Sequence, residues 1–386
     1  MSAKVLVVDD EPDLEQLILQ KFRKQIRQKE YEFMFAPNGV AALAKLAEAT
    51  GIDVVLTDIN MPEMDGLTLL SKLREDSKLL KPVVVSAYGD MENIRTAMNR
   101  GAFDFVTKPI DLTDLEVTLA KAIDELNTLK NALKSRDQLI AIQQELDIAT
   151  AIQTSILPQK FPAFPDRQQL DIYAKMITAK EVGGDFYDFF AIDKNRIGFT
   201  VGDVSGKGVP AAMFMAVSRT LLKSTALKGI PPDECLRSIN NILEEESPAN
   251  MFVTIFYGVL DTRSGAVEYC NGGHNLPCLL HRDGSVEKLR NIGGVFVGAF
   301  KDMEFESKVM ILQPGETLVL YTDGVTEAAD VKDEMFDDKR LEKCLQSLHA
   351  EPVQEIPNRV ITAVKEFSSG VPQSDDITVL ALRYNG

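Results

Sequence analysis

Four short runs of apolar residues mark the first third of the chain. They read KVLVV, DVVLT, KPVVV and FDFVT, and each is continuous rather than alternating, which is typical of strands buried on both faces of a parallel sheet. Stretches with helical spacing lie between them, at residues 38–49 and 91–100. Strands that alternate with helices predict an α/β fold with a doubly wound parallel sheet.

A long stretch with regularly spaced leucines begins at Asp111 and contains no glycine or proline before Pro158. Its apolar residues keep the three-four spacing of a coiled-coil seam, first at Leu115, Leu119, Ala122, Leu126, Leu129 and Leu133, and again at Leu139, Ile142, Leu146 and Ala149. The spacing slips at residues 134–137, where we expect the seam to rotate or break. We predict a helical coiled-coil linker that forms a parallel homodimer. The alternative is a long helix packed on its own domains.

After the proline-punctuated segment PQKFPAFPD the pattern changes to short strand-like runs with turn residues between them. Six such runs are DIYAKMI, RIGFTV, MFVTIFYGVLD, AVEYC, ETLVLY and ITVLALRY, and helical patterns cover Val209–Ala226 and Pro232–Glu246. This order predicts an α+β domain, a layered antiparallel β-sandwich flanked by helices. We therefore divide the chain into residues 1–126, a linker at 127–157, and residues 158–386.

Composition excludes several classes of function. The formal charge of −16 and a pI near 4.8 argue against nucleic acid as a partner, because phosphate-backbone binding needs a basic surface. The apolar runs are too short to span a membrane, and the N-terminus lacks the layout of a signal peptide, so we expect a cytoplasmic protein. The 4 cysteines and 3 histidines show no spacing typical of a zinc site or a disulfide framework.

Polar residues end the four runs of the first third. Asp9 and Asp10 follow the first run, Asp58 ends the second, Ser86 the third and Lys108 the fourth. Ligands of doubly wound sheets bind beyond the carboxyl ends of the strands, so we expect these side chains to meet there. Clustered acids repel one another unless a hard cation such as Mg²⁺ takes their oxygens as ligands. A lone aspartate would more often cap a helix, but a set in this order points to phosphoryl chemistry.

The segment from Met1 to about Leu126 resembles the response-regulator receiver domains of the CheY-like family, whose fold is flavodoxin-like. The resemblance implies that Asp58 accepts a phosphoryl group from a histidine kinase. It also implies that Mg²⁺ is bound by Asp10, Asp58 and the Asn60 carbonyl, with Asp9 in support. Ser86 and Phe105 would form the switch pair, and Lys108 would be the conserved lysine of the family. A receiver that dimerises without being phosphorylated is the alternative.

A second set of aspartates lies next to glycines or at the ends of strand-like runs in the second half. They are Asp185 in VGGDFYDFF, Asp203 in GDVSGKG, Asp323 in YTDGV, and Asp375 and Asp376 in SDDITV. Acids at strand ends beside glycines suit an oxygen-only site for Mg²⁺ or Mn²⁺, because glycine lets a backbone carbonyl and water approach closely. Two such ions can share one water and direct it at phosphorus.

The motifs GGDFYD, GDVSGKGVPAAM, NGGHNLP, YTDGVTEA and SDDITVL resemble the SpoIIE-like branch of the PPM metal-dependent serine/threonine phosphatases, over about Glu145 to Tyr384. The resemblance implies that two Mn²⁺ or Mg²⁺ ions are held by Asp185, Asp203, the Val204 carbonyl and Asp323, with Asp375 or Asp376 completing the set and Asp375 preferred. Lys207 and Ser205 would touch phosphate or shape a turn, and His274 would have a structural role in a turn.

The two resemblances together imply a two-component response regulator whose output is a protein phosphatase, a phosphoric monoester hydrolase controlled by phosphorylation of Asp58. Its substrate would be a phosphoserine or phosphothreonine protein, typically an anti-sigma-factor antagonist. One alternative is an adaptor that sequesters a partner without turnover. Another is a nucleotide cyclase, because VGGDFYDFF resembles the GGDEF signature, but Phe186 stands where that signature has an acid.

Overall fold

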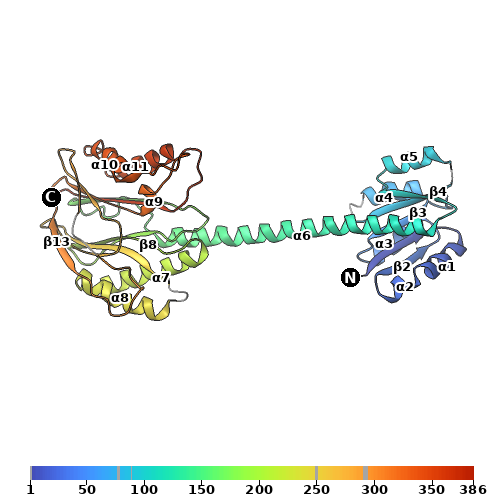
Figure 1. Ribbon diagram of the computed structural model, residues 1–386, viewed down its shortest axis with the longest axis horizontal. Coiled ribbons are helices and arrows are strands. Elements are labelled where there is room, and N and C mark those ends of the chain that lie inside the picture. Colours follow the sequence, from blue (N-terminus) through green and yellow to red (C-terminus); the bar gives the residue numbers. More distant parts are fainter. Residues whose placement is uncertain (1, 76–78, 88, 248–250, 290–293) are drawn as a thin grey trace. The chain divides into compact units, whose positions relative to one another are not determined.

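The computed structural model describes residues 2–75, 79–87, 89–247, 251–289 and 294–386. The chain divides into two compact units, Met1–Ala141 and Ile142–Gly386, and each is described by itself. Figure 1 labels the elements of both. The domain boundaries that we placed at residues 126 and 157 stay predictions.

The first unit contains a parallel sheet of five strands in the order β2-β1-β3-β4-β5. The strands are β1 (Ala3–Val8), β2 (Tyr31–Ala36), β3 (Val54–Asp58), β4 (Lys81–Ala87) and β5 (Asp104–Lys108), and the helices are α1 (Pro12–Lys21), α2 (Arg23–Arg27), α3 (Gly39–Glu48), α4 (Gly66–Glu75) and α5 (Met91–Asn99). This confirms the predicted doubly wound α/β fold. Strand β2 was not among the predicted strands.

Successive side chains of the central strands point to opposite faces of this sheet, and each face has its own core. On β1, Val5 and Val7 pack in one cluster with α1, whereas Leu6 and Val8 pack in another with α3 and α4. Burial on both faces explains why these strands appear in the sequence as continuous apolar runs.

Helix α6 (Leu112–Ile156) is continuous through the predicted linker. Its first apolar residues, Leu115, Leu119 and Ala122, are fully buried in the core of the first unit. They cannot also contact a second copy, so this part of the predicted seam is wrong. A helix that packs on its own sheet shows the same three-four spacing as a coiled coil, and the spacing alone does not distinguish them. Farther along, Leu129 and Leu139 are 42% and 67% exposed.

The second unit contains two antiparallel sheets of five strands each, in the orders β13-β10-β9-β8-β7 and β12-β11-β14-β15-β6. The strands are β6 (Leu170–Ile177), β7 (Phe186–Ala191), β8 (Arg196–Val204), β9 (Val253–Asp261), β10 (Ala266–Gly272), β11 (Cys278–Leu280), β12 (Val286–Lys288), β13 (Ser307–Ile311), β14 (Thr317–Tyr321) and β15 (Ile377–Tyr384). The predicted antiparallel sandwich is confirmed.

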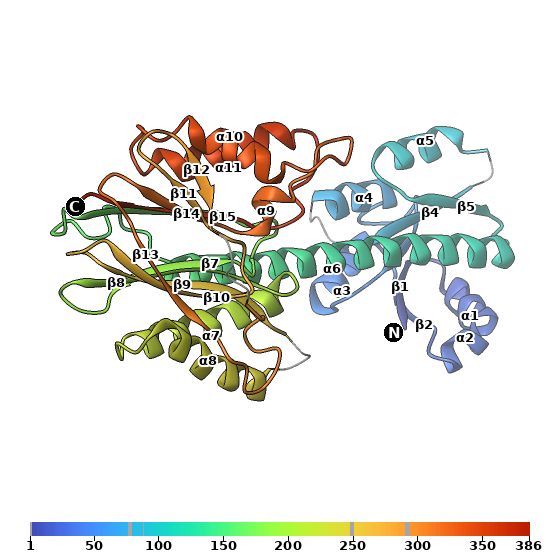
Figure 2. The same ribbon diagram turned by 60° about the vertical axis from the view of Figure 1, so that its left-hand side comes forward.

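Helices cover the outer faces of both sheets, so the unit has a layered order of helix, sheet, sheet and helix (Figure 2). They are α7 (Val209–Ala226) and α8 (Pro232–Glu246) on one side, and α9 (Asp323–Thr326), α10 (Asp337–Gln346) and α11 (Glu355–Phe367) on the other. The bounds of α7 and α8 are those that the apolar spacing predicted. On β15, Leu380 and Leu382 face the core between the sheets, while Val379 and Ala381 face α11.

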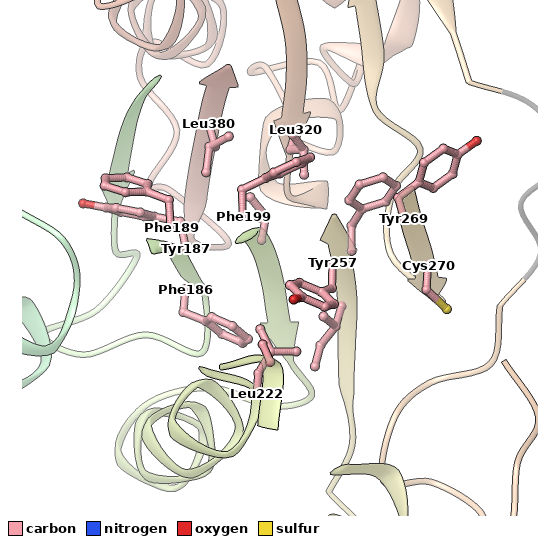
Figure 3. Close-up of a cluster of buried hydrophobic side chains, with 14 of the residues drawn as sticks. Phe186, Tyr187, Phe189, Phe199, Leu222, Tyr257, Tyr269, Cys270, Leu320 and Leu380 are labelled. Carbon is pink, nitrogen blue, oxygen red and sulfur yellow. The ribbon is translucent and has the colours of Figure 1, made fainter. Parts of the chain in front are cut away.

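The core between the sheets is rich in aromatic residues (Figure 3). Phe199 of β8 lies between the sheets with Leu320 of β14 and Leu380 of β15, whereas Phe186 of β7 packs on the outer face of its sheet with Leu222 of α7. Phe186 is fully buried, and a Cβ on Gly202 would lie 2.5 Å from its ring. The residue after Asp185 therefore belongs to the core, where a charged side chain would be very costly.

Within the described residues, no helix has both the length and the apolar character that crossing a membrane requires.

Candidate metal centres

Three acids meet at the carboxyl edge of the first unit's sheet. Asp9, Asp10 and Asp58 each place one carboxylate oxygen within 4.8 Å of the others. In the described part of the chain they are the one group of three or more acids, histidines or cysteines that meets this limit. The backbone N–H of Asn60 donates to Oδ1 of Asp58 at 3.3 Å, which places the loop after β3 beside the same cluster. An all-oxygen set of this kind suits Mg²⁺.

Lys108 enters the same cluster from the end of β5. Its Nζ lies 2.7 Å from Asp58, 3.0 Å from Glu11 and 3.3 Å from Asp9. Burial by itself would lower the pKa of Lys108, but the hydrogen bonds to Asp58 and Glu11 raise this pKa well above its ordinary value. Burial is also the main cause that raises the pKa of Asp9. The lysine therefore keeps its charge and neutralises part of the acidic cluster.

The two residues predicted as a switch pair differ in exposure. Ser86, near the end of β4, is 1% exposed, whereas Phe105 on the neighbouring strand β5 is 36% exposed. Ser86 lies on the strand next to that of Asp58, and the ring of Phe105 lies half-exposed on the edge strand, which is compatible with the predicted pair.

Asp185 occupies the centre of the second unit, in the loop that leads into β7. It is 1% exposed, and its Oδ2 accepts hydrogen bonds from Thr322 Oγ1 at 2.7 Å and from Thr378 Oγ1 at 2.6 Å. Thr322 directly follows β14, and Thr378 lies on β15. These hydrogen bonds therefore fix the Asp185 carboxylate to the sheet that does not contain β7. Sequence reasoning missed both threonines, although each stands inside a motif that it singled out, YTDGV or DDITV.

The other predicted site aspartates of the second unit lie within electrostatic reach of Asp203, although among the described residues no three of them meet the 4.8 Å limit that the first cluster meets. Asp203, on β8, is close enough to Asp185 for a hydrogen bond between the two carboxyl groups. Burial, followed by repulsion from Asp323 and Asp375, raises the pKa of Asp203 to about 7. Burial and the charge of Asp203 raise the pKa of Asp185 well above its usual range, and burial and Asp375 raise that of Asp323. This crowding of acids is what bound cations would relieve.

Glycine brings a backbone carbonyl into the same cluster. A Cβ added to Gly184 would lie 2.9 Å from the carbonyl oxygen of Val204, closer than real Cβ contacts allow. The loop before Asp185 can therefore pass directly over this carbonyl only because residue 184 is glycine. The donor set is all oxygen, which fits Mg²⁺ or Mn²⁺.

The adjacent acids Asp375 and Asp376 have different surroundings. Asp376 is 6% exposed; its Oδ1 accepts the N–H of Ala179 at 2.8 Å, and its Oδ2 accepts those of Gly184 at 2.7 Å and Asp185 at 3.3 Å. The side chain of Asp375 is 38% exposed and pairs with Lys207 Nζ at 2.8 Å. Asp376 therefore shapes the loop before β7, while Asp375 faces the open side of the cluster.

The neighbouring Gly183 explains why this loop needs two glycines. A Cβ on Gly183 would lie 2.0 Å from Oδ2 of Asp376. Its peptide group is also paired with the last part of α6: Gln153 Nε2 donates to the Gly183 carbonyl at 2.7 Å, and the Gly183 N–H donates to Gln153 Oε1 at 3.1 Å. Gln153, which sequence reasoning also missed, joins the helix directly to the loop that carries Asp185.

Two further residues singled out by sequence have structural partners. Ser205 exchanges two hydrogen bonds with the backbone of Phe252, at 2.9 and 3.0 Å. His274 is buried, and its Nδ1 lies 2.8 Å from Thr254 Oγ1. Burial lowers the pKa of His274 to about 4, so this imidazole is neutral. Both residues stabilise turns close to the cluster.

Comparison with known families matches two parts of the chain. The family model of stage II sporulation protein E (SpoIIE) matches residues 193–385, and that of the response regulator receiver domain matches residues 5–120.

Among curated proteins, protein IcfG of Synechocystis sp. is 30% identical over 313 residues, which are 70% of this chain and 48% of that protein. Phosphoserine phosphatase RsbU of Bacillus subtilis is 28% identical over 242 residues, 63% of this chain and 70% of that protein. The chain thus spans about half the length of the first of these relatives and about two thirds of the second.

Among solved structures, the RsbU and RsbW domains of Rv1364c from Mycobacterium tuberculosis superpose with a TM-score of 0.50 at 26% identity, covering 56% of this chain and 60% of that one. The SiaA-PP2C domain of Pseudomonas aeruginosa superposes with a TM-score of 0.56 at 23% identity, covering 64% of this chain and 98% of that one. The second likeness concerns the fold alone.

Proposed function

The chain belongs to the SpoIIE family and carries a response-regulator receiver domain, and from this premise we propose that it is a response regulator whose output is a metal-dependent protein serine/threonine phosphatase. The observation that carries the proposal is the position of the buried Asp203 between Asp185, to which it is close enough to hydrogen-bond, and Asp323 and Asp375, whose charges raise its pKa. Buried acids whose pKa values are shifted together are typical of functional sites.

In this proposal Asp185, Asp203, Asp323, Asp375 and the Val204 carbonyl hold two divalent cations, Mn²⁺ or Mg²⁺. When bound, the ions would supply a nucleophilic water of lowered pKa for hydrolysis of the phosphate ester, which yields phosphate and the free serine or threonine hydroxyl. The protein positions the groups around them. Thr322 and Thr378 hold the Asp185 carboxylate in one orientation, which spares the reaction the cost of ordering it.

We assign the ligand role to Asp375 and a positioning role to Asp376. Three backbone N–H groups already occupy both oxygens of Asp376. Asp375 has an oxygen on the open side, where Lys207 pairs with it. Replacing Asp375 by Asn should therefore weaken metal binding in a folded protein, whereas Asp376→Asn should lower the thermal stability of the second unit as well.

In the receiver domain, we propose that Asp58 accepts a phosphoryl group from a histidine kinase. The P–N bond of a phosphohistidine breaks and a P–O bond to a carboxylate oxygen of Asp58 forms. Asp9, Asp10, Asp58 and the Asn60 carbonyl would hold Mg²⁺ for this step, and Lys108, already 2.7 Å from Asp58, would bind an oxygen of the new phosphoryl group. Ser86 and Phe105 would respond to it as the switch pair.

Control of the phosphatase by Asp58 would run through α6. The pairing of Gln153 with Gly183 supports this, because a shift of the helix would move the loop that carries Asp185. A homodimer through the exposed part of α6 remains our proposal; disulfide crosslinking of Leu133→Cys that yields no dimer, with or without phosphorylation, would count against it. If Asp58→Ala and the protein treated with beryllofluoride hydrolyse substrate at one rate, control by Asp58 is excluded.

The proposed substrate is a phosphoserine or phosphothreonine regulatory protein, of the kind of an anti-sigma-factor antagonist, and the name of the relative RsbU, a phosphoserine phosphatase, supports the residue type. The test is Mn²⁺-dependent release of phosphate from a phosphoserine protein, with Asp203→Ala as the control. Stable binding of phosphoproteins without turnover would favour the adaptor instead. A product from GTP would favour the cyclase, which the buried Phe186 already disfavours.

A further inference from the structure

A cavity of about 350 Å³ lies beside Asp375 in the second unit. One wall is formed by Gly324 of α9 and by Ala328 and Ala329 that follow it, and the other by the end of α11 and the loop that leads into β15. Asp375 lines the cavity, and Gly324 directly follows Asp323. The cavity is therefore lined by one proposed metal ligand, Asp375, and by the residue that follows another.

Hydrogen bonds hold the loop before β15, which forms one wall of the cavity, in a fixed shape. The Gln373 side chain donates to the Ile177 carbonyl at 2.9 Å and to the Asp375 carbonyl at 2.7 Å, and Lys207 Nζ donates to the Ser374 carbonyl at 2.6 Å. At the other wall, a Cβ on Gly324 would lie 2.0 Å from the Asp376 carbonyl oxygen, so the two backbones touch. A site formed in advance in this way loses little entropy when it is filled.

The chemistry of the lining suits an apolar group. The lining includes the buried residues Ala328 and Ile377 and the apolar residues Val371 and Pro372, with Ser368, Ser369, Ser374 and Gln373 beside them. Among the described residues that line the cavity, Lys365 is the one basic side chain, and it is exposed. A phosphate dianion binds most strongly where several cationic groups meet, and a lining with one exposed lysine favours an apolar group over it. The volume is at the small end of the range for ligand pockets, which suits one or two side chains.

We propose that this cavity, a substrate subsite on the open side of Asp375, receives the aliphatic side chain next to the phosphorylated residue of the substrate protein. The inference rests on the proposed function and adds a specificity determinant to it. Consecutive residues of an extended chain lie about 3.3–3.6 Å apart, so a phosphoserine at the metals brings its neighbour to the mouth of the cavity. The exposed Lys365 at the rim would favour an acidic residue farther along the substrate.

The test uses the full chain with Mn²⁺ and three probes: phosphoserine peptides with Val or with Trp next to the phosphoserine, and p-nitrophenyl phosphate. The wild type should hydrolyse the Val peptide with a kcat/KM about 10-fold or more above that of the Trp peptide. Ala329→Phe, which fills the cavity, should raise KM for the Val peptide about 10-fold and leave kcat within about two-fold, because a binding contact is lost in ground and transition state alike. Hydrolysis of p-nitrophenyl phosphate should not change.

A matched control is Ala266→Phe, which fills a different cavity of about 280 Å³ between β10 and the start of α8, lined by none of the proposed metal ligands. It should leave all three rates unchanged. If Ala329→Phe does not fold, Val371→Tyr fills the same cavity from the opposite wall. An unchanged KM for the Val peptide in the folded variant, or equal rates for the two peptides, overturns the subsite. A wild type inactive even on p-nitrophenyl phosphate would instead remove the proposed function, and the subsite with it.

Discussion

The two acidic clusters of this protein contain the same kind of side chain but neutralise it differently. In the first unit Asp9, Asp10 and Asp58 share their site with Lys108, whose ammonium lies 2.7 Å from Asp58. In the second unit the buried Asp185 is bonded to two threonine hydroxyls. The nearest lysine recorded on these acids, Lys207, pairs with the outer residue Asp375 and is 45% exposed.

The difference shows what each cluster needs from solution. Lys108 supplies positive charge at any metal concentration, so the folded state tolerates the first acidic cluster without a bound cation. The same ammonium can bind a phosphoryl oxygen in place of a carboxylate. Hydroxyl groups orient a carboxylate but do not cancel its charge, and the raised pKa of Asp203, about 7, follows from burial and from the acids around it. We therefore expect the second cluster to depend on divalent cations for both activity and stability.

The largest expected effect comes from removing one acid of either cluster. Asp203→Asn should lower phosphatase activity on the order of 10³-fold, because the metal contribution to the transition state is several kcal/mol. It should leave uptake of a phosphoryl group from acetyl phosphate unchanged. Asp58→Asn should abolish that uptake and leave basal hydrolysis of p-nitrophenyl phosphate intact.

The two rates are measured as release of phosphate and as incorporation of ³²P into the chain. Loss of both activities in either variant would mean that the clusters are not chemically independent, and the comparison would fail.

A second prediction compares a largely buried ion pair of the second unit with a pair of the first unit whose lysine is partly exposed. Asp188 on β7 is 0% exposed and lies 2.7 Å from Arg219 and 3.4 Å from Lys223, both on α7. Arg219→Met leaves a buried carboxylate with one weaker partner and should cost about 3 kcal/mol. In the first unit, Lys130 is 41% exposed where it pairs with Asp53, and Lys130→Met should cost less than about 1 kcal/mol.

Calorimetry of the full chain measures both variants. The Arg219 variant should lower the unfolding temperature of the second unit by roughly 6–12 °C, and the Lys130 variant should hardly change that of the first. Equal shifts would mean that burial does not decide the strength of these pairs.

The sequence predicted the elements well where burial is complete. Helices α7 and α8 and strand β15 lie where the apolar spacing placed them. Strand β2 was missed because YEFMFA is largely half-exposed and lacks a continuous apolar run. Residues Leu115 to Ala122 were assigned to a dimer seam because a helix on a sheet and a helix in a coiled coil have the same periodicity.

The candidate site was predictable only in part, for a geometric reason. The sequence indicated which aspartates stand at strand ends, but Asp375 and Asp376 are adjacent, and neighbouring residues of an extended chain point to opposite sides. Which one faces the cluster depends on the register of β15 with β6 and β14, which no local pattern contains. The hydroxyls of Thr322 and Thr378 were missed because a single threonine carries no sign of its partner.

A third prediction concerns pH. In chelator-treated protein the folded pKa of Asp203, about 7, lies above the unfolded value of about 3.9, so the folded state binds more protons between these two values. The stability of the second unit should therefore fall as pH rises from 5 to 7, by on the order of 2 kcal/mol, and change little above that. In the first unit Lys108 stays charged across this pH range, so the unfolding temperature of the first unit should change less with pH than that of the second.

Calorimetric scans at pH 5, 6, 7 and 8 with chelator, and at pH 7 with Mn²⁺ added, test this expectation. Mn²⁺ at about 100 times its dissociation constant should restore about 2.7 kcal/mol. A second unit that gains stability with rising pH in the absence of metal would show that its acids are not crowded.

The smallest expected effect concerns Lys207, whose pairing with Asp375 has the same charge pattern as that of Lys108 with Asp58. Hydrogen bonding to Asp375 raises the pKa of Lys207, so the lysine is a charged competitor for the proposed metal ligand. Because the Lys207–Asp375 ion pair is half-exposed, it contributes at most about 1 kcal/mol. Lys207→Met removes this competition for Asp375 and should therefore tighten Mn²⁺ binding about 3- to 5-fold.

Electron paramagnetic resonance of free Mn²⁺ measures this affinity without substrate, and Lys365→Met, an exposed lysine of the same unit, is the matched control. Weaker binding in the Lys207 variant would mean that the ammonium orients Asp375 for the ion instead of competing with it. The lysines of the two clusters would then serve one purpose, which is to hold an aspartate in place. The contrast between a fixed cation in the first unit and an exchangeable one in the second would be lost.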